Sequence, residues 1–223
     1  MYLKVVWGNI DAVIKPYLWN TGPKMPALLS VENTGTGDVN ITMPTAEQDL
    51  RPRAYSTNII AQNGNITGNL IHGAETTLNA KNGFIDVTLL PHNVDSETRS
   101  VIRTESRYGD TRVRMLESVQ GDAMKRTWSR HDVGGGTMAH CCEPGSLWLQ
   151  YPADWFGTLD GRAKNGSIEL QISENGGDLN LTGIKDDLVS PGFQSISASR
   201  GEGGSEVNFW VGNGQAEVLL GSS

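Results

Sequence analysis

The side chains with the greatest chemical potential lie in one short segment that combines histidine, cysteine and carboxylate groups. They are His131, Asp132, His140, Cys141, Cys142 and Glu143. Thiolates and imidazoles bind metal ions, and a cysteine beside a histidine can act as a nucleophile. The spacing matches no zinc pattern, because it has no Cys-x-x-Cys pair and adjacent strand residues point to opposite faces. We therefore expect no metal, no cofactor and no catalytic residue here, and we expect Cys141 and Cys142 to be reduced.

A second set of reactive groups consists of four carboxylates in the later part of the chain: Asp154, Asp160, Glu169 and Glu174. A glycosidase needs two carboxylates about 5–9.5 Å apart, which facing strands can provide. Nothing in the sequence singles out one pair, so solvated positions on an outer strand face are the simpler interpretation. The sequence also lacks a nucleophile elbow, a phosphate-binding loop and a His-Glu-x-x-His motif.

Tryptophan is frequent, with six copies in the chain. Exposed aromatic rings stack on sugars or anchor protein partners, whereas buried rings fill a core. Together with the two histidines, the tryptophans of the 120–160 region are the candidate ligand-binding side chains. These candidates are Trp128, His131, His140, Trp148 and Trp155. The alternative is that the rings are core residues.

Charge and hydropathy exclude several classes of protein. The formal net charge is −7 and the isoelectric point is about 5.1, so we expect no nucleic-acid partner, because phosphate binding needs a basic surface. No apolar run approaches the ~18 residues of a membrane-spanning helix, and the first residues lack the layout of a signal peptide. We therefore expect no membrane insertion by this chain. The 223 residues suit one large all-β domain.

One pattern recurs along the chain: alternating residues, a small-residue turn centred on glycine, then an alternating strand. Its clearest copies are residues 29–43, 59–70 and 77–90, and weaker copies are 101–115, 159–172 and 196–209. The pattern predicts strands at 58–62, 65–71, 76–81, 84–90, 100–105, 110–116, 147–151 and 166–172, with under about 10% helix. Asn63-Gly64 and Asn82-Gly83 are strong turn signals.

Two folds are compatible with this pattern. Taken alone, each unit is a β-hairpin. Turn glycines that recur with no helix between them are also what the coils of a β-solenoid require. We predict the second: an all-β, single-domain β-solenoid over residues 1–223, built from irregular repeats of about 19–27 residues. Residues 1–26 are expected to form an N-terminal cap, 120–145 a loop insertion and 196–221 the C-terminal coil.

Three segments resemble the fungal adhesin-like domain family, which is related to bacterial putative-adhesin β-solenoids. They are residues 52–73, 77–91 and 147–161. The family has a Tyr-x-Thr run that ends in His-Gly, matched by Tyr55-Ser-Thr57 and His72-Gly73, and a Tyr-Pro-x-x-Trp-x-Gly run, matched from Tyr151. The resemblance covers roughly residues 29–220 and implies a β-solenoid at the cell surface or outside the cell. This chain departs from the family in lacking an anchor and in having Asn-Gly where Ser-Gly is common.

The sequence therefore predicts a non-catalytic surface or interaction module, adhesin-like, that binds a glycan or a protein partner. The alternative is an enzyme on the same scaffold, acting on a polysaccharide or a small molecule in a cleft beside residues 120–145. A third class is a structural protein that stacks end to end. We also expect self-association through the C-terminal coil, where Glu217 is the one charged residue among the apolar residues of 209–211 and 216–220.

Overall fold

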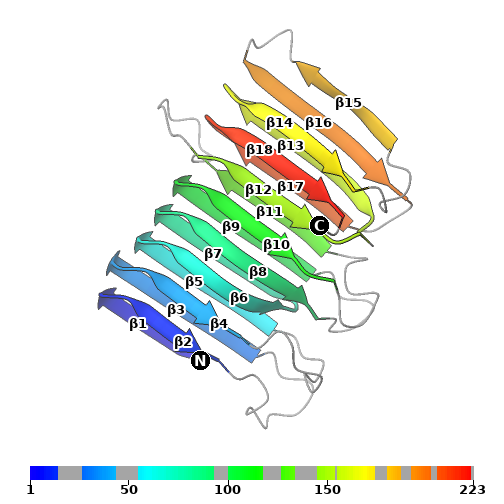
Figure 1. Cartoon of the computed structure of the whole chain (residues 1–223). Helices are drawn as coiled ribbons and strands as arrows, with labels where there is room; N and C mark the ends of the chain where they lie inside the picture. Colours follow the sequence, from blue (N-terminus) through cyan, green and yellow to red (C-terminus); the bar gives the residue numbers. More distant parts are fainter. Residues whose placement is uncertain are drawn as a thin grey trace.

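The computed structural model describes ten stretches of the chain. They are residues 1–14, 27–43, 55–92, 100–117, 127–133, 145–153, 155–173, 180–186, 192–201 and 205–221. Within these stretches the chain forms eighteen β-strands and no helix, which confirms the all-β class (Figure 1).

Ten of the strands form the larger of two sheets. In spatial order they are β1 (Tyr2–Trp7), β3 (Ala27–Thr36), β5 (Tyr55–Asn63), β7 (Glu75–Asn82), β9 (Ser100–Tyr108), β11 (Thr127–Val133), β17 (Ser205–Val211), β13 (Gly157–Lys164), β16 (Phe193–Arg200) and β15 (Asn180–Asp186). Neighbouring strands are parallel except at β16, which is antiparallel to both β13 and β15.

The other eight strands form the smaller sheet, in which all neighbours are parallel. In spatial order they are β2 (Ile10–Val13), β4 (Val39–Thr42), β6 (Ile66–His72), β8 (Ile85–Pro91), β10 (Thr111–Met115), β12 (Leu147–Tyr151), β18 (Gln215–Leu220) and β14 (Ser167–Ile172). All eight strands predicted from the sequence are present.

Consecutive strands alternate between the two sheets from β1 to β14. The Asn-Gly turns therefore join strands that lie in different sheets, and the hairpin interpretation is wrong: β5 and β6 flank Asn63-Gly64 but pair with β3, β7, β4 and β8 instead of with each other. Two consecutive strands and the turn between them form one layer, and the layers form a stack (Figure 1).

The core lies between the sheets and is formed by alternate residues of the interior strands whose burial the structure describes, as in β5, β8 and β13. The register places inward residues of successive strands next to one another, as in the run Val31, Ile59 and Leu78 of the larger sheet. These three side chains are fully buried. Because burial of one such side chain stabilises by about 1.5–3 kcal/mol, these apolar columns account for much of the stability of the stack.

A column of eight glycines forms one corner of the stack. Each lies two residues before the first buried residue of a smaller-sheet strand. In spatial order they are Gly8, Gly37, Gly64, Gly83, Gly109, Gly145, Gly214 and Gly166. A Cβ added to Gly64 would collide with the carbonyl oxygen of Gly37, and one added to Gly83 with that of Gly64. The recurring glycine of the sequence pattern is therefore required by close approach between layers.

At four of the corners, the residue after the glycine links its layer to the next through a side-chain oxygen. The side-chain oxygen of Asn9 accepts a hydrogen bond from the Asp38 N–H (3.0 Å), and that of Asp38 from the Asn65 N–H (2.8 Å). Asn65 accepts in the same way from the Phe84 N–H (3.0 Å). This ladder of side-chain acceptors satisfies backbone donors that the turn would otherwise leave unpaired.

The expected layout of the last strands is wrong. The predicted C-terminal coil, residues 196–221, does not end the stack. Strands β17 and β18 lie in the interior of the two sheets, between β11 and β13 and between β12 and β14 (Figure 1). Both edges of each strand are paired, so the open edges expected there do not exist. Strand alternation predicts strands but says nothing about which layers are neighbours.

The expected loop insertion at residues 120–145 contains a strand. Strand β11 lies within it and pairs with β9 on one side and β17 on the other. Its sequence is largely polar, which is why the hydrophobic alternation missed it. Of the expected N-terminal cap, residues 1–14 form β1 and β2 at one edge of both sheets, and residues 15–26 lie outside the described residues.

Candidate binding surfaces

The structure does not bring the five candidate ligand-binding residues together. Trp148 lies on β12 of the smaller sheet, whereas Trp128 and His131 lie on β11 of the larger sheet. In the backbone register, Trp128 pairs with Val101 and Glu206, and His131 with Thr104 and Phe209. His140, Cys141 and Cys142 lie outside the described residues.

Trp155 is a core residue, which corrects its assignment as a ligand-binding side chain. Only 1% of it is exposed, and its ring packs against Tyr151 with the centroids 5.8 Å apart. It follows β12 directly and fills the space between the sheets where the chain crosses from one to the other. The Tyr-Pro-x-x-Trp-x-Gly run from Tyr151 is therefore as compatible with packing in the core as with ligand binding.

Trp148 lies on the outer face of the smaller sheet, within a row of charged side chains. Asp86, Arg112, Trp148 and Glu217 are neighbours in register across β8, β10, β12 and β18. The Arg112 guanidinium lies 5.6 Å from the centre of the Trp148 ring and 3.6 Å from the Asp86 carboxylate. One face of the ring therefore already has a cation–π partner.

Of the four candidate carboxylates, the two that the structure describes lie on different sheets. Asp160 belongs to β13 of the larger sheet and Glu169 to β14 of the smaller one, while Asp154 and Glu174 lie outside the described residues. Glu169 is next to Glu217 in register. The Gln171 amide donates to Glu169 (2.9 Å) and to Glu217 (3.4 Å), so these carboxylates belong to an exposed polar ladder. Within the described part of the chain, no three His, Cys, Asp or Glu side chains are grouped to hold a metal ion.

A buried histidine pair lies at the corner where β6 and β8 end. The Nδ1 atom of His72 is 2.9 Å from Thr76 Oγ1, and burial lowers the pKa of His72 to about 3. The neighbouring ring of His92, also buried, meets Tyr55 edge-on, with 5.9 Å between centroids. Because it is enclosed and neutral, His72 is a structural group that makes the corner sensitive to acid.

The largest gathering of exposed apolar side chains lies at the N-terminal end, by which we mean Met1, β1, β2 and Leu28. Among the described residues, nine large apolar side chains are exposed, and six of them belong to this end. The six are Met1, Tyr2, Val6, Trp7, Val13 and Leu28. Trp7 is 75% and Val13 is 71% exposed. This clustering makes the N-terminal end the candidate binding surface of the molecule.

Both sheets have an open edge at the N-terminal end. Within the described residues, β1 pairs with β3 alone and β2 with β4 alone. The Met1 carbonyl accepts from the Ser30 N–H, and strand residues alternate in direction, so the backbone groups of Tyr2 and Lys4 face the open edge. The two open edges therefore offer backbone donors and acceptors beside the apolar side chains.

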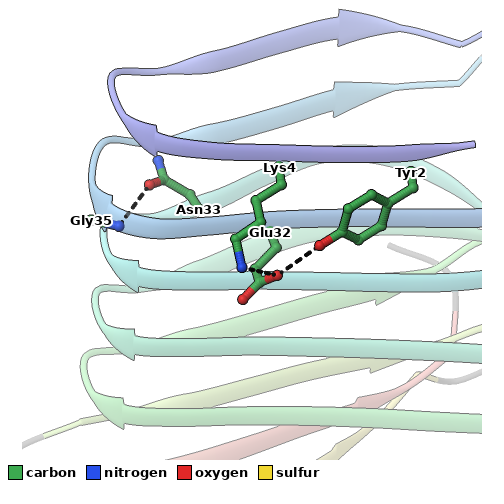
Figure 2. A network of polar contacts seen from close by, with 5 residues as sticks. All are labelled: Tyr2, Lys4, Glu32, Asn33 and Gly35. Atoms are coloured by element: carbon green, nitrogen blue, oxygen red, sulfur yellow. Dashed lines mark hydrogen bonds and ion pairs between the residues drawn. The ribbon is translucent and has the colours of Figure 1, made fainter.

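Polar contacts fix β1 against β3 (Figure 2). The Lys4 ammonium is 3.0 Å from the Glu32 carboxylate, and the Tyr2 hydroxyl donates to the same carboxylate at 3.0 Å. The hydrogen bond from Lys4 holds the pKa of Glu32 below its usual value, and the same bond raises the pKa of Lys4. Figure 2 shows both side chains reaching from β1 across to Glu32, so the edge strand is held in place before any partner binds.

A second network fastens the corner of the same layers. Asn33 is fully buried, and its amide donates to the carbonyls of Gly8 (3.0 Å) and Gly37 (2.9 Å). Its side-chain oxygen accepts from the Gly35 N–H at 3.2 Å (Figure 2). One side chain thus joins the first two layers of the stack.

Sequence reasoning assigned this end as a cap and did not identify it as a candidate site. The available signal was the run of apolar residues on both strands, from Tyr2 to Val13, with Lys4 as the one cation among them. Comparisons of the chain with protein-family models, with curated proteins and with solved structures found no match. The resemblance to the fungal adhesin-like family stays a prediction. Within the described residues, no helix is long and apolar enough to cross a membrane.

Proposed function

We propose that this chain is a non-catalytic interaction module, built as a β-solenoid, that binds a protein partner at its N-terminal end. The observation that carries the proposal is the coincidence of six exposed apolar side chains with the open edges of both sheets. The partner adds a strand to an edge through backbone hydrogen bonds, and the apolar side chains anchor it.

The solenoid assignment rests on three features of the stack. Successive strands alternate between two sheets, the layers are in parallel register, and the corner glycine recurs in every layer that contains a smaller-sheet strand. These are the properties of coils that bury one continuous core by stacking. The reversal at β16 interrupts this plan late in the chain.

A protein partner is favoured over a glycan by the state of the aromatic rings. A sugar that stacked on Trp148 from the Arg112 side would have to displace the guanidinium from the ring. Trp155 is enclosed in the core. Trp7, in contrast, is exposed and lies beside unpaired backbone groups, a combination that suits an extended peptide better than a sugar.

The test is selection of peptides from a random library displayed on phage, with the protein immobilised through a tag fused to its C-terminus. Counter-selection uses the variant Val6→Lys/Val13→Lys, which places a charge on each edge strand. The matched control is Ile172→Lys, which changes an exposed apolar residue of β14 at the other end of the smaller sheet.

We expect peptides with alternating apolar residues to be enriched on the native protein and on the control, and to be lost on the edge variant. Two results would overturn the proposal. One is that no peptide is enriched on the native protein, and the other is that the edge variant retains the same peptides with unchanged affinity.

A further inference from the structure

We infer that the partner at the N-terminal end is a second copy of this chain, bound about a two-fold axis that runs perpendicular to the sheets. This inference rests on the proposed function, because it names the occupant of the same surface. The dimer joins β1 to β1 and β2 to β2, so both sheets continue from one copy into the other.

The first argument is that the surface has two edges. The open edges of β1 and β2 belong to one layer and are separated by the thickness of the core. A single extended peptide can pair with one of them and leaves the other unpaired. A partner that satisfies both must carry two parallel edges at the same separation, and the first layer of another copy has this property.

The second argument is that the opposite end of the stack does not fit. The smaller sheet ends there at β14, whereas the larger sheet continues past β13 through β16 and β15. If a second copy stacked head to tail, its β1 would pair with β15 of the first copy. Its β2 would then be separated from β14 of the first copy by a gap two strands wide. Head-to-tail contact therefore leaves one edge open, and only contact between two N-terminal ends closes both.

The third argument concerns symmetry. A two-fold axis perpendicular to the sheets sets each edge strand antiparallel to its own copy. The same patch then contacts itself, and the assembly closes at two chains. Antiparallel pairing allows hydrogen bonds between the groups of Tyr2 and Lys4 that face the edge. It also covers Leu3 and Val5, which are only partly buried at the end of the core.

The fourth argument is the placement of charge on the edge. A lysine on an edge strand normally opposes pairing with another strand. Here the Lys4 ammonium is bound to Glu32 of β3 at 3.0 Å, so it is directed back over its own sheet (Figure 2). The lysine that would otherwise oppose strand pairing at this edge is therefore bound by a carboxylate of the same chain.

The experiment measures the oligomeric state by sedimentation velocity over a range from about 1 to 200 µM. The native protein is compared with Val6→Lys and Val13→Lys, which place a new cation in the interface of both copies, and with the control Ile172→Lys. Circular dichroism of each variant verifies that the strand content is unchanged.

We expect a monomer–dimer equilibrium for the native protein and for the control. Each edge variant should raise the dissociation constant at least about 30-fold, because it adds a cation to the pairing edge of both copies. The inference is overturned if the native protein is a monomer throughout, if it grows beyond two chains, or if Ile172→Lys dissociates it equally.

The failures of the two proposals are distinguishable. A monomer that still selects peptides at its N-terminal end refutes the second copy and leaves the binding module standing. A monomer that selects none refutes both. In a true dimer, a selected peptide must also compete, so that its addition shifts the sedimentation profile to the monomer.

Discussion

The two ends of the stack differ in how the sheets finish. At the N-terminal end, β1 and β2 are the last strands of both sheets in the described part of the chain, so both sheets end at the same layer. At the other end, the chain reverses direction in β16, and the larger sheet alone is extended, by an antiparallel pair. An antiparallel strand presents a different spacing of donors and acceptors from the parallel layers behind it. The larger sheet ends two strands beyond the smaller one, so the two sheets do not finish at the same layer at this end.

The aromatic side chains show the same contrast. On the larger sheet near β16, Trp210 packs against Phe193 with 6.1 Å between ring centroids, and the Lys164 ammonium lies 5.9 Å from the Phe193 ring. These rings are neighbours of one another within the chain. Trp7 at the N-terminal end is 75% exposed. Among the described residues, the exposed large apolar side chains are therefore concentrated at the N-terminal end.

The largest effect on stability is expected from removing β17 and β18, which end the chain in sequence but lie in the interior of the stack. Deletion of residues 205–223 takes β17 and β18 from the interior of both sheets. It removes one of the two neighbours of β11, β12 and β13, and the one neighbour that β14 has among the described residues. We expect loss of the cooperative unfolding transition, followed by circular dichroism during thermal denaturation. Deletion of residues 1–14, which removes a true end, should leave one cooperative transition. Equal behaviour of the two deletions would contradict the distinction between interior and end.

The next effect compares two corner glycines, one inside the stack and one at its end. Gly64→Ala forces a Cβ against the Gly37 carbonyl and should lower the free energy of unfolding by about 2–4 kcal/mol. A Cβ on Gly8 meets nothing within 4 Å, although its φ of +105° disfavours alanine by about 1–2 kcal/mol. Urea denaturation of both variants measures the difference. A larger loss for Gly8→Ala would show that layer contact is not what requires the glycines.

A pH-dependent effect is expected in the interior, away from both ends. The folded pKa of His72 is about 3, below the unfolded value of 6.5, so the unfolded state binds the extra proton between these values. This contribution to stability is complete above about pH 6.5 and is lost as pH falls, by about 2 kcal/mol from pH 7 to pH 5.

The variant His72→Asn isolates the pH-dependent contribution of His72 to the free energy of unfolding. Carboxylates titrate alike in both proteins, so they cancel when the two free energies of unfolding are subtracted at each pH. The difference should shrink as the pH falls from 7 to 5. A difference independent of pH in this range would mean that His72 does not stay neutral in the folded protein.

The smallest effect concerns the charge network of the N-terminal end. Glu32→Gln removes the carboxylate that holds Lys4 and releases the ammonium toward the open edge. Because the pair is exposed, we expect almost no change in thermal stability but weaker self-association at low salt. Lys4→Gln serves as the opposite control and should leave association unchanged or stronger. Sedimentation at low and high salt measures both.

The sequence was sufficient to predict strands and corners but not neighbours. Gly64 and Gly83 recur in the sequence pattern because the contact between layers leaves no room for a Cβ at either position. No local pattern records that β17 lies next to β11, since their residues are far apart in the chain. Strand β11 was not predicted because its sequence is polar. Its pairing with β9 and β17, more than its own hydrophobicity, holds it in the sheet.

The candidate site could be predicted less well, for a related reason. The presence of a tryptophan in a sequence does not reveal whether its ring is buried, as in Trp155, or exposed, as in Trp7. Exposure depends on which layer is last, and that is a property of the assembled stack. The sequence therefore indicated aromatic candidates but could not rank them.

The interior position of β17 and β18 has a consequence for biosynthesis. A ribosome makes β1–β12 and then β13–β16 before it makes the two strands that lie between them. Until then, β11 and β12 on one side and β13 and β14 on the other lack the layer between them, and this gap leaves apolar residues open to chaperones and to aggregation. The late strands must thread into this gap with contacts distant in sequence, which slows folding. Supplying residues 205–221 as a separate peptide to a chain that stops before them should therefore reconstitute the stack.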